Sequence, residues 1–293
     1  VSTITPYGTG SANITISLAG PLIDVPGGTL ATGFANGTTV AAFQIGKFEV
    51  TWAEWQEVKS WASANGYTDL VTYHEDVAPP FDKNRADTFP VEFVTWYDVI
   101  KWCNARSERD GLTPVYQVGG ATYRTGESVP TVNALANGYR LPTEVEWEWA
   151  ARGGLSSQGY TYSGSNSSSG VAWAGYNETK AVGTLMANEL GIHDMSGNVW
   201  EWCWDASSSS RRRRGGSSFD FASSSTIGTR STRLPNLASS STGFRLVRNL
   251  PAVVEKMPYV RGGTLVTANS LNGTSVAALR VGKYEVTGAE WTA

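Results

Sequence analysis

Three tryptophans at alternating positions constrain this chain more than any other feature. Trp200, Trp202 and Trp204 repeat with the two-residue period of a β-strand. The dipeptide Gly197-Asn198 just before them is typical of a turn. Three indole rings on one face of a strand bury a large apolar area, so we expect this strand to lie in a hydrophobic core.

The composition changes directly after this strand. Residues 206–249 contain no Lys, Glu, His, Cys, Trp or Tyr and consist mostly of Ser, Arg, Gly, Thr and small apolar residues. Alternation in Gly243–Arg248 predicts a closing strand. Because core strands are expected on both sides of residues 206–245, here called the Ser/Arg segment, we expect that segment to form loops on a rigid frame.

Composition places the chain among globular proteins and excludes other classes. Its 293 residues are 11% aromatic and include 12 Trp, enough for a large core. A net charge of −3 argues against a general nucleic-acid binder, although Arg211–Arg214 is locally basic. No apolar run reaches the roughly 20 residues that span a bilayer. Two cysteines cannot form a disulfide framework.

Capping residues predict where the helices begin. Thr51 with Glu54, and Thr143 with Glu146, form Thr-x-x-Glu capping boxes. Thr95 is the expected N-cap of a further helix. We predict two main helices, over about 52–65 and 96–110, and a third over about 144–152.

An internal repeat indicates more than one unit. Residues 260–291 repeat residues 25–55 nearly one for one, including Gly-Lys-Tyr-Glu-Val-Thr at 282–287. Thr/Ile alternation in the first 20 residues is typical of a β-hairpin. We therefore expect the tail of a preceding β-sandwich-like module in 1–23, one complete domain in 24–250, and a linker with the incomplete start of a second copy in 251–293.

Motifs spread over residues 24–250 resemble one known family, the sulfatase-modifying, formylglycine-generating-enzyme-like domain. The matching motifs, in chain order, are Gly46–Thr51, Pro90–Asp98, Cys103-Asn104, Gly111–Tyr116, Tyr139–Gly154, Asp194–Trp202, Arg214–Ser217 and Gly243–Arg245. This resemblance implies an α+β domain of the C-type lectin-like fold, with two main helices and small twisted antiparallel sheets.

The resemblance also bears on catalysis. Enzymes of this family bind copper through a pair of cysteines in the C-terminal third, and residues 215–244 contain none. Thiolate is the ligand and redox group of that chemistry, and Ser cannot replace it. Iron-dependent relatives use three histidines, whereas this chain has only His74 and His193. We expect no catalytic residues, and no cofactor apart from a structural calcium.

Calcium is implied by the turn before the tryptophan strand. In this family the turn supplies oxygen ligands, and Asn198 and Glu201 occupy the matching positions. The alternative is that Asn198 adopts a left-handed turn conformation while Glu201 pairs with an arginine.

A subset of the family uses the interval matching the Ser/Arg segment as a hypervariable region, rewritten by diversity-generating retroelements at adenines of asparagine codons. The residue types found there are largely those reachable from such a codon, although Ser-rich low complexity would give much the same composition. The candidate ligand-binding residues, expected to project from loops, are Ser208, Arg211, Arg213, Ser218, Phe219, Asp220, Ser224, Arg230 and Arg233.

The resulting functional hypothesis is a non-catalytic binding protein at the cell surface or outside the cell. Its expected partner is a protein or other surface ligand, of acidic character because arginines favour acidic surfaces. Nucleic acid is not expected, because the chain carries a net charge of −3. Two alternatives remain open: an oxidase or related enzyme of the same fold, and a structural module of a large extracellular protein.

Overall fold

The computed structural model describes residues 21–71, 87–250, 263–264 and 275–276. The chain divides into two units, Val1–Asn249 and Leu250–Ala293. Most of the expected module in 1–23 lies outside the described residues. Leu22 and Ile23, however, belong to strand β1 (Leu22–Val25), which pairs inside the first unit, so this unit begins before residue 24.

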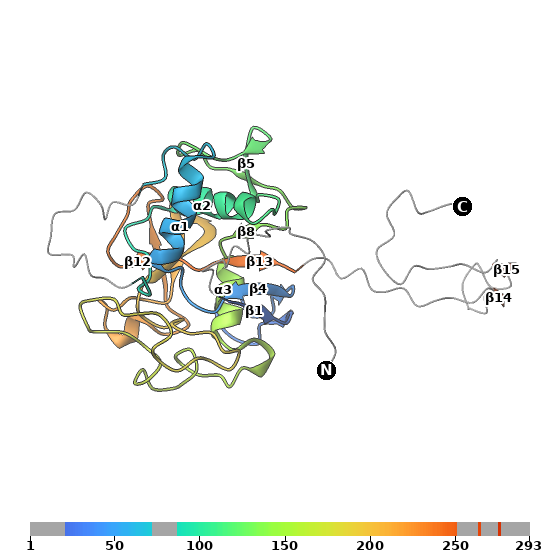
Figure 1. Ribbon diagram of the computed structural model, residues 1–293. Coiled ribbons are helices and arrows are strands. Elements are labelled where there is room, and N and C mark those ends of the chain that lie inside the picture. Colours follow the sequence, from blue (N-terminus) through green and yellow to red (C-terminus); the bar gives the residue numbers. More distant parts are fainter. Residues whose placement is uncertain (1–20, 72–86, 251–262, 265–274, 277–293) are drawn as a thin grey trace, which may run out of the picture. The chain divides into compact units, whose positions relative to one another are not determined.

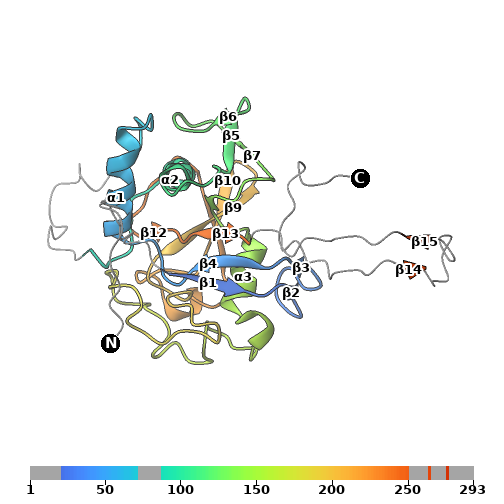
Figure 2. The same ribbon diagram turned by 45° about the vertical axis from the view of Figure 1, so that its right-hand side comes forward.

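The tryptophan strand is β9 (Trp200–Ser207), which is labelled beside β10 in Figure 2. It lies inside a four-stranded sheet of order β11-β10-β9-β12. Its neighbours are β10 (Ser210–Arg214) and β12 (Thr242–Gly243), and β11 (Arg230–Arg233) lies beyond β10. The β9–β12 pair is parallel, whereas β10 pairs antiparallel with both neighbours. The family resemblance implied antiparallel sheets, and this sheet departs from it by one parallel pair.

Three helices form where the capping residues predicted (Figure 1). They are α1 (Trp52–Ser63), α2 (Trp96–Arg109) and α3 (Glu144–Ala151), and each begins with a complete capping box. Helix α2 is buried around almost its whole circumference, from Trp96 to Ser107, because it packs against α1 and the sheets. None of the described helices is long and apolar enough to cross a membrane.

A second four-stranded sheet has the order β1-β4-β13-β8 and is antiparallel throughout. It joins β1 to β4 (Phe43–Gly46), β13 (Val247–Asn249) and β8 (Tyr139–Arg140). The predicted closing strand Gly243–Arg248 is wrong as one element. It divides into β12 in one sheet and β13 in the other, because residues 244–246 carry the chain between the sheets.

Strand β9 separates two hydrophobic clusters. Trp202 lies in the cluster of α1 and α2, and its indole nitrogen donates to the Val94 carbonyl at 3.1 Å. Cys203, on the opposite face, lies in the cluster of α3 with Trp147. Both faces of the strand are therefore packed, which explains why it can anchor the segment that follows.

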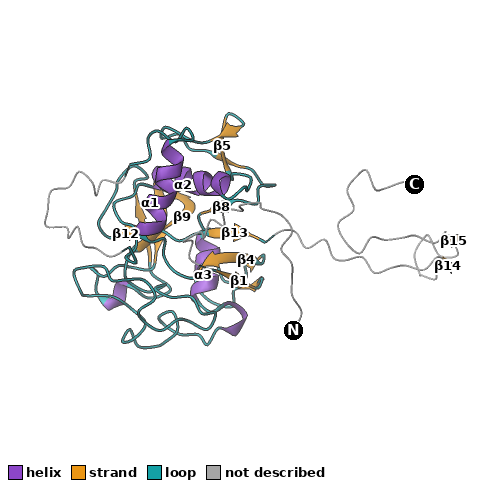
Figure 3. Ribbon diagram, viewed as in Figure 1, coloured by secondary structure: helices purple, strands orange, loops and turns teal. Residues whose placement is uncertain are grey.

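Short hairpins and long loops complete the first unit (Figure 3). Strand β2 (Gly28–Thr29) pairs with β3 (Thr39–Val40), and β5 (Tyr116–Val118) pairs with β6 (Ala121–Thr122) and β7 (Thr131–Val132). A single 3-10 turn, η1 (Gly154–Ser156), precedes the long connection to β9.

The second unit carries one described hairpin, which matches the repeat. Strand β14 (Gly263–Thr264) pairs with β15 (Ser275–Val276), and Gly263 lies opposite Val276. In the first copy Gly28 lies opposite Val40 in the same way. The repeated residues thus form the same hairpin in the same register.

Candidate functional site

The Ser/Arg segment is more ordered than predicted, because strands occupy much of it. Arg211 and Arg213 lie in β10, and Arg230 and Arg233 lie in β11. Ser224 ends the 3-10 turn η2 (Ala222–Ser224). The remaining candidate residues lie in turns: Ser208, Ser218, Phe219 and Asp220.

Two of the candidate residues do not project from the surface, and for them the expectation was wrong. Ser218 is fully buried, and its backbone bonds to Asn198 and Tyr176. Arg211 is only 7% exposed, and its guanidinium lies 3.8 Å from the centre of the Trp96 ring. It donates to the Trp204 carbonyl at 2.8 Å. Both residues serve mainly to hold the segment against the core.

Other residues of the segment are exposed, including some that sequence reasoning did not select. Ser208 lies in the β9–β10 turn with a positive φ of 55°, and Phe219 and Arg230 are also exposed. The most exposed large apolar residue of the segment is Phe221, at 83%. Leu234 and Leu237 follow β11 and are exposed as well. Exposed apolar side chains often mark a binding surface. The polar composition of the segment gave no indication of them.

The arginines of β10 and β11 divide between the two faces of the sheet. Arg212 and Arg214 alternate with Arg211 and Arg213, and Arg214 lies directly opposite Arg230. Side chains directly opposite each other in paired strands share a face. One face therefore carries Arg212, Arg214 and Arg230, and the other carries Arg211, Arg213 and Arg233.

The first of these faces meets two glutamates of helix α3. Arg214, fully buried, pairs with Glu144 at 3.0 Å and Glu148 at 2.7 Å. Arg230 pairs with Glu144 at 2.6 Å, and Arg212 reaches the same carboxylate at 3.6 Å. Burial would raise the pKa of Glu144, but the hydrogen bonds from Arg230 and Arg214 outweigh it and lower that pKa. These arginines tie the sheet to the helix.

The second face has a different electrostatic character. Arg213 donates to Thr242 Oγ1 at 2.7 Å and to Ser231 Oγ at 3.2 Å, and its guanidinium lies 5.0 Å from the Trp200 ring centre. Arg233 donates to the Leu237 and Ala238 carbonyls. Within the described part of the chain, neither these two arginines nor Arg211 forms an ion pair. Burial, together with the charge of Arg233, lowers the pKa of Arg213 to about 10.

The two suggested calcium ligands, Asn198 and Glu201, accept hydrogen bonds from protein groups. Glu201 Oε1 and Oε2 accept from Arg245 at 2.6 and 2.7 Å, and Oε2 also accepts from Trp147. Asn198 has a positive φ of 59°, accepts from the Lys180 amide and donates to Glu49. These contacts match the ion-paired alternative, because both Glu201 oxygens already have donors. Calcium binding by this pair stays a prediction that the contacts disfavour.

Two further buried carboxylates lie in electrostatic reach of Arg245. Burial, with the neighbouring charges of Asp194 and Glu201, raises the pKa of Glu49 well above its usual range. Burial also raises the pKa of Asp194, whose Oδ1 is buried without a hydrogen bond. Among the residues that the structure describes, no group of three or more His, Cys, Asp and Glu side chains could hold a metal ion.

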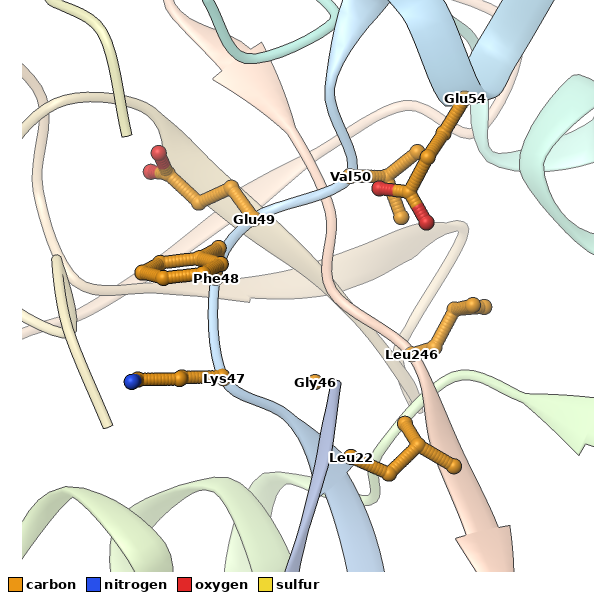
Figure 4. A pocket seen from close by; sticks show the side chains of 8 residues that line it. All are labelled: Leu22, Gly46, Lys47, Phe48, Glu49, Val50, Glu54 and Leu246. Carbon is orange, nitrogen blue, oxygen red and sulfur yellow. The ribbon is translucent and has the colours of Figure 1, made fainter. Parts of the chain in front are cut away.

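A shallow recess lies beside Glu49, with an empty volume of about 250 Å³ that includes its open mouth (Figure 4). In Figure 4 the side chains of Lys47, Phe48 and Glu49 point to one side of their segment. The recess is lined by Leu22, Gly46, Lys47, Phe48, Glu49, Val50, Glu54 and Leu246. Glu54 pairs with Arg106 at 2.9 Å, and Glu49 accepts from Asn198 and Val199, so both carboxylates already bond within the fold.

The two cysteines lie in different cores. Cys103 belongs to the cluster of α1 and α2, Cys203 belongs to the cluster of α3, and both are free and buried. Burial raises the pKa of each thiol. A thiol with a raised pKa is a poor nucleophile and metal ligand, because the thiolate is the reactive form.

Comparisons with known proteins agree with this fold. The domain family described as "Sulfatase-modifying factor enzyme 1-like domain" matches residues 17–250. "Chaperone protein LppX" of Paenibacillus barcinonensis is 39% identical over 227 residues, covering 67% of this chain and 74% of that protein. "Formylglycine-generating enzyme" of Mycobacterium tuberculosis is 29% identical over 223 residues, covering 62% and 72%. "Inactive C-alpha-formylglycine-generating enzyme 2" of Mus musculus is 29% identical over 262 residues, covering 76% and 80%.

Two solved structures are also similar over most of the first unit. CarF superposes with a TM-score of 0.70 and 31% identity, covering 79% of this chain and 98% of CarF. "Treponema denticola variable protein 1" superposes with a TM-score of 0.64 and 29% identity, covering 78% and 95%. The predicted C-type lectin-like fold is confirmed.

Proposed function

This chain belongs to the sulfatase-modifying factor enzyme 1-like family, and we propose that it is a non-catalytic ligand-binding member that uses the Ser/Arg segment as its binding surface. The observation that carries the proposal is the way the segment is held. Buried Trp202 precedes it, buried Phe244 lies near its C-terminal end, and fully buried Arg214 fixes β10 to helix α3. Exposed residues between these anchors can therefore vary at little cost in stability.

The exposed side chains of the segment suit recognition of a protein. Phe219 and Phe221 offer aromatic anchors, and the exposed side chains of Ser208 and Ser223 offer adaptable hydrogen bonds. The similarity to a protein named a variable protein supports a diversified binding face. Under this proposal the partner is a protein or other surface ligand of acidic character, met at the cell surface or outside the cell. Calcium is not required for binding.

A non-catalytic role is supported by the cysteine chemistry. No cysteine occurs in residues 215–244, where copper-binding members of the family carry their pair, and Cys103 and Cys203 are buried in separate cores. The family includes both active and inactive relatives. An oxidase would need thiolates that this chain does not present in that interval.

A chaperone-like role is a second candidate, favoured by a specific observation. The relative named a chaperone is 39% identical, and Phe221, Leu234 and Leu237 are exposed apolar residues of the Ser/Arg segment. Under this second candidate, the surface would bind apolar stretches of a client protein and not an acidic partner. Weakening of binding by salt would separate the two, because screening weakens charge pairing and leaves apolar contacts intact.

The proposal can be tested without knowing the natural ligand. A displayed library of random dodecapeptides is selected against the immobilised protein, and the selected peptides are titrated against two variants. One variant carries Phe219→Ser, Phe221→Ser and Ser208→Asp. The control carries Leu155→Ser and Met186→Ser, which change two exposed apolar residues outside the Ser/Arg segment.

We expect the first variant to lose peptide binding with a near-unchanged melting temperature, and the control to retain it. Peptides that keep their affinity for the first variant but lose it for the control would refute the proposal. Sequences of natural alleles provide an independent check, since diversification predicts differences confined to about 206–245. Within that range Arg214 should not vary, because it is fully buried between two glutamates.

A further inference from the structure

We propose that Arg213 and Arg233 form a subsite for the carboxylate of an aspartate or glutamate side chain on the partner protein. This inference rests on the proposed function and adds the chemistry of one contact. Six arginines lie within the paired strands β10 and β11, and among the described residues only three of them pair with glutamates.

The two faces of the β10–β11 pair provide an internal comparison. Arg214, on one face, lies within 3.0 Å of two glutamate carboxylates. Arg213, the preceding residue, points to the other face, where it donates to the hydroxyls of Thr242 and Ser231. Arg233 shares this face, and its partners are two backbone carbonyls. The fold thus neutralises one face and leaves the other cationic.

Arg213 also keeps unused capacity for hydrogen bonding. Its Nε is buried and has no acceptor. A guanidinium remains charged at any physiological pH, so half-burying it without a carboxylate costs free energy. The neighbouring charge of Arg233 adds to that cost, as the lowered pKa of Arg213 shows. An external carboxylate that pairs with this guanidinium would supply the missing countercharge.

Asp220, the acidic residue nearest to Arg213 in the sequence, already accepts hydrogen bonds from other residues. Asp220 raises the pKa of Arg213 through its charge, so it lies within electrostatic reach. Its Oδ2 accepts from Trp200 Nε1 at 2.8 Å and from the amide and hydroxyl of Ser217. Asp220 therefore stabilises the Trp200 ring that Arg213 covers and forms no ion pair with Arg213.

The site fits a protein carboxylate better than a nucleic-acid backbone. A planar carboxylate matches the fork of a single guanidinium, and exposed Phe219 and Phe221 flank Asp220 in the chain. A nucleic acid needs a run of cations along its backbone, whereas three of the six arginines here are paired with glutamates. An acidic segment of a folded or extended protein is the partner of choice.

The probe for the test is N-acetylated, C-amidated hexaglutamate with a fluorescent label, titrated by anisotropy at low salt. Hexathymidylate is the phosphate-bearing comparison. The variants are Arg213→Gln, Arg213→Lys and the matched control Arg124→Gln. Arg124 is a half-exposed arginine paired with Glu108 outside the β10–β11 sheet. Melting temperatures confirm that each variant is folded.

We expect Arg213→Gln to weaken hexaglutamate binding roughly tenfold or more, as for loss of one member of a desolvated charge pair. Arg213→Lys should be intermediate, because it keeps the charge but loses the fork. Arg124→Gln should stay within about twofold, as for a screened surface charge.

Three results would overturn the subsite: no saturable binding of hexaglutamate, equal losses for Arg213→Gln and Arg124→Gln, or tighter Arg213-dependent binding of hexathymidylate. The proposed function has a separate readout. Library peptides that depend on Phe219 and Phe221 but not on Arg213 would remove the subsite and leave the binding surface. Peptides indifferent to the whole Ser/Arg segment would remove both.

Discussion

The substitution Glu201→Gln tests what holds the Ser/Arg segment to the rest of the domain. Glu201 and Arg245 are both fully buried, and they meet through two contacts of 2.6 and 2.7 Å. Arg245 also donates to the Gly46 and His193 carbonyls, so its guanidinium joins β9 to the second sheet. Glutamine keeps the size of the side chain but leaves the buried guanidinium without its closest countercharge.

The expected cost follows from that uncompensated charge. Removal of one partner of a buried ion pair typically costs about 3–5 kcal/mol. Glu49 and Asp194 also interact with Arg245 and have raised pKa values. They ionise more readily once Glu201 is neutral, which moves the expected cost to about 3 kcal/mol. For a domain of this size that is a fall in melting temperature of roughly 6–12 °C.

The assay is thermal and urea unfolding of the wild type, Glu201→Gln, Arg245→Met and the double variant, each with and without EDTA. Glu178→Gln is the control, since its exposed pair with Lys180 should be worth well under about 1 kcal/mol. We expect the double variant to be less destabilised than the sum of the single variants, because it buries no lone charge. A loss of unfolding free energy under about 1 kcal/mol for Glu201→Gln would refute the ion-pair argument. Calcium would be favoured if EDTA lowered the melting temperature of the wild type but not that of Glu201→Gln.

Three further predictions concern the core, acid stability and metals. Trp202→Ala should cost about 3–5 kcal/mol in urea unfolding, because a fully buried ring leaves a cavity, and a near wild-type midpoint would contradict the packing of β9. Arg140 lowers the pKa of Glu146 against the opposing effect of burial. The stability that Glu146 adds should therefore be present above its unfolded pKa of about 4.3 and be lost as pH falls through the lower folded value. The stability gap between wild type and Glu146→Gln should shrink from pH 7 to pH 3, and a constant gap would contradict this linkage. Elemental analysis should find neither copper nor iron at one per chain; stoichiometric copper that disappears with Cys203→Ser would revive the oxidase alternative.

Local signals in the sequence predicted the helices and the central strand well. The boxes at Thr51 and Thr143, and the cap at Thr95, place their helices correctly because capping depends on side chains within three residues. The two-residue period of the tryptophans predicted β9 correctly. The strand is packed on both faces. The alternative that Glu201 pairs with an arginine also appeared in sequence reasoning, although the identity of Arg245 did not.

Long-range contacts decided what local signals could not. Four consecutive arginines give no indication of strand, yet β10 pairs with β9 and β11. Its Arg214 also pairs with Glu144 and Glu148, which lie 70 and 66 residues earlier. The closing strand was predicted as one element because the alternation in 243–248 is continuous. It breaks because Arg245 has to reach Glu201, a partner 44 residues away. Neither partner is visible from periodicity.

The division of the arginines also links fold to function. A run of identical residues in a strand sends alternate side chains to opposite faces. Helix α3 supplies glutamates to one face, and those contacts hold the sheet in place. The other face offers tryptophan rings and hydroxyl groups, so Arg213 forms no ion pair with a described residue. The same four-residue run therefore provides an anchor that must be retained and a contact that can change with the ligand, which is the combination that a diversified binding surface requires.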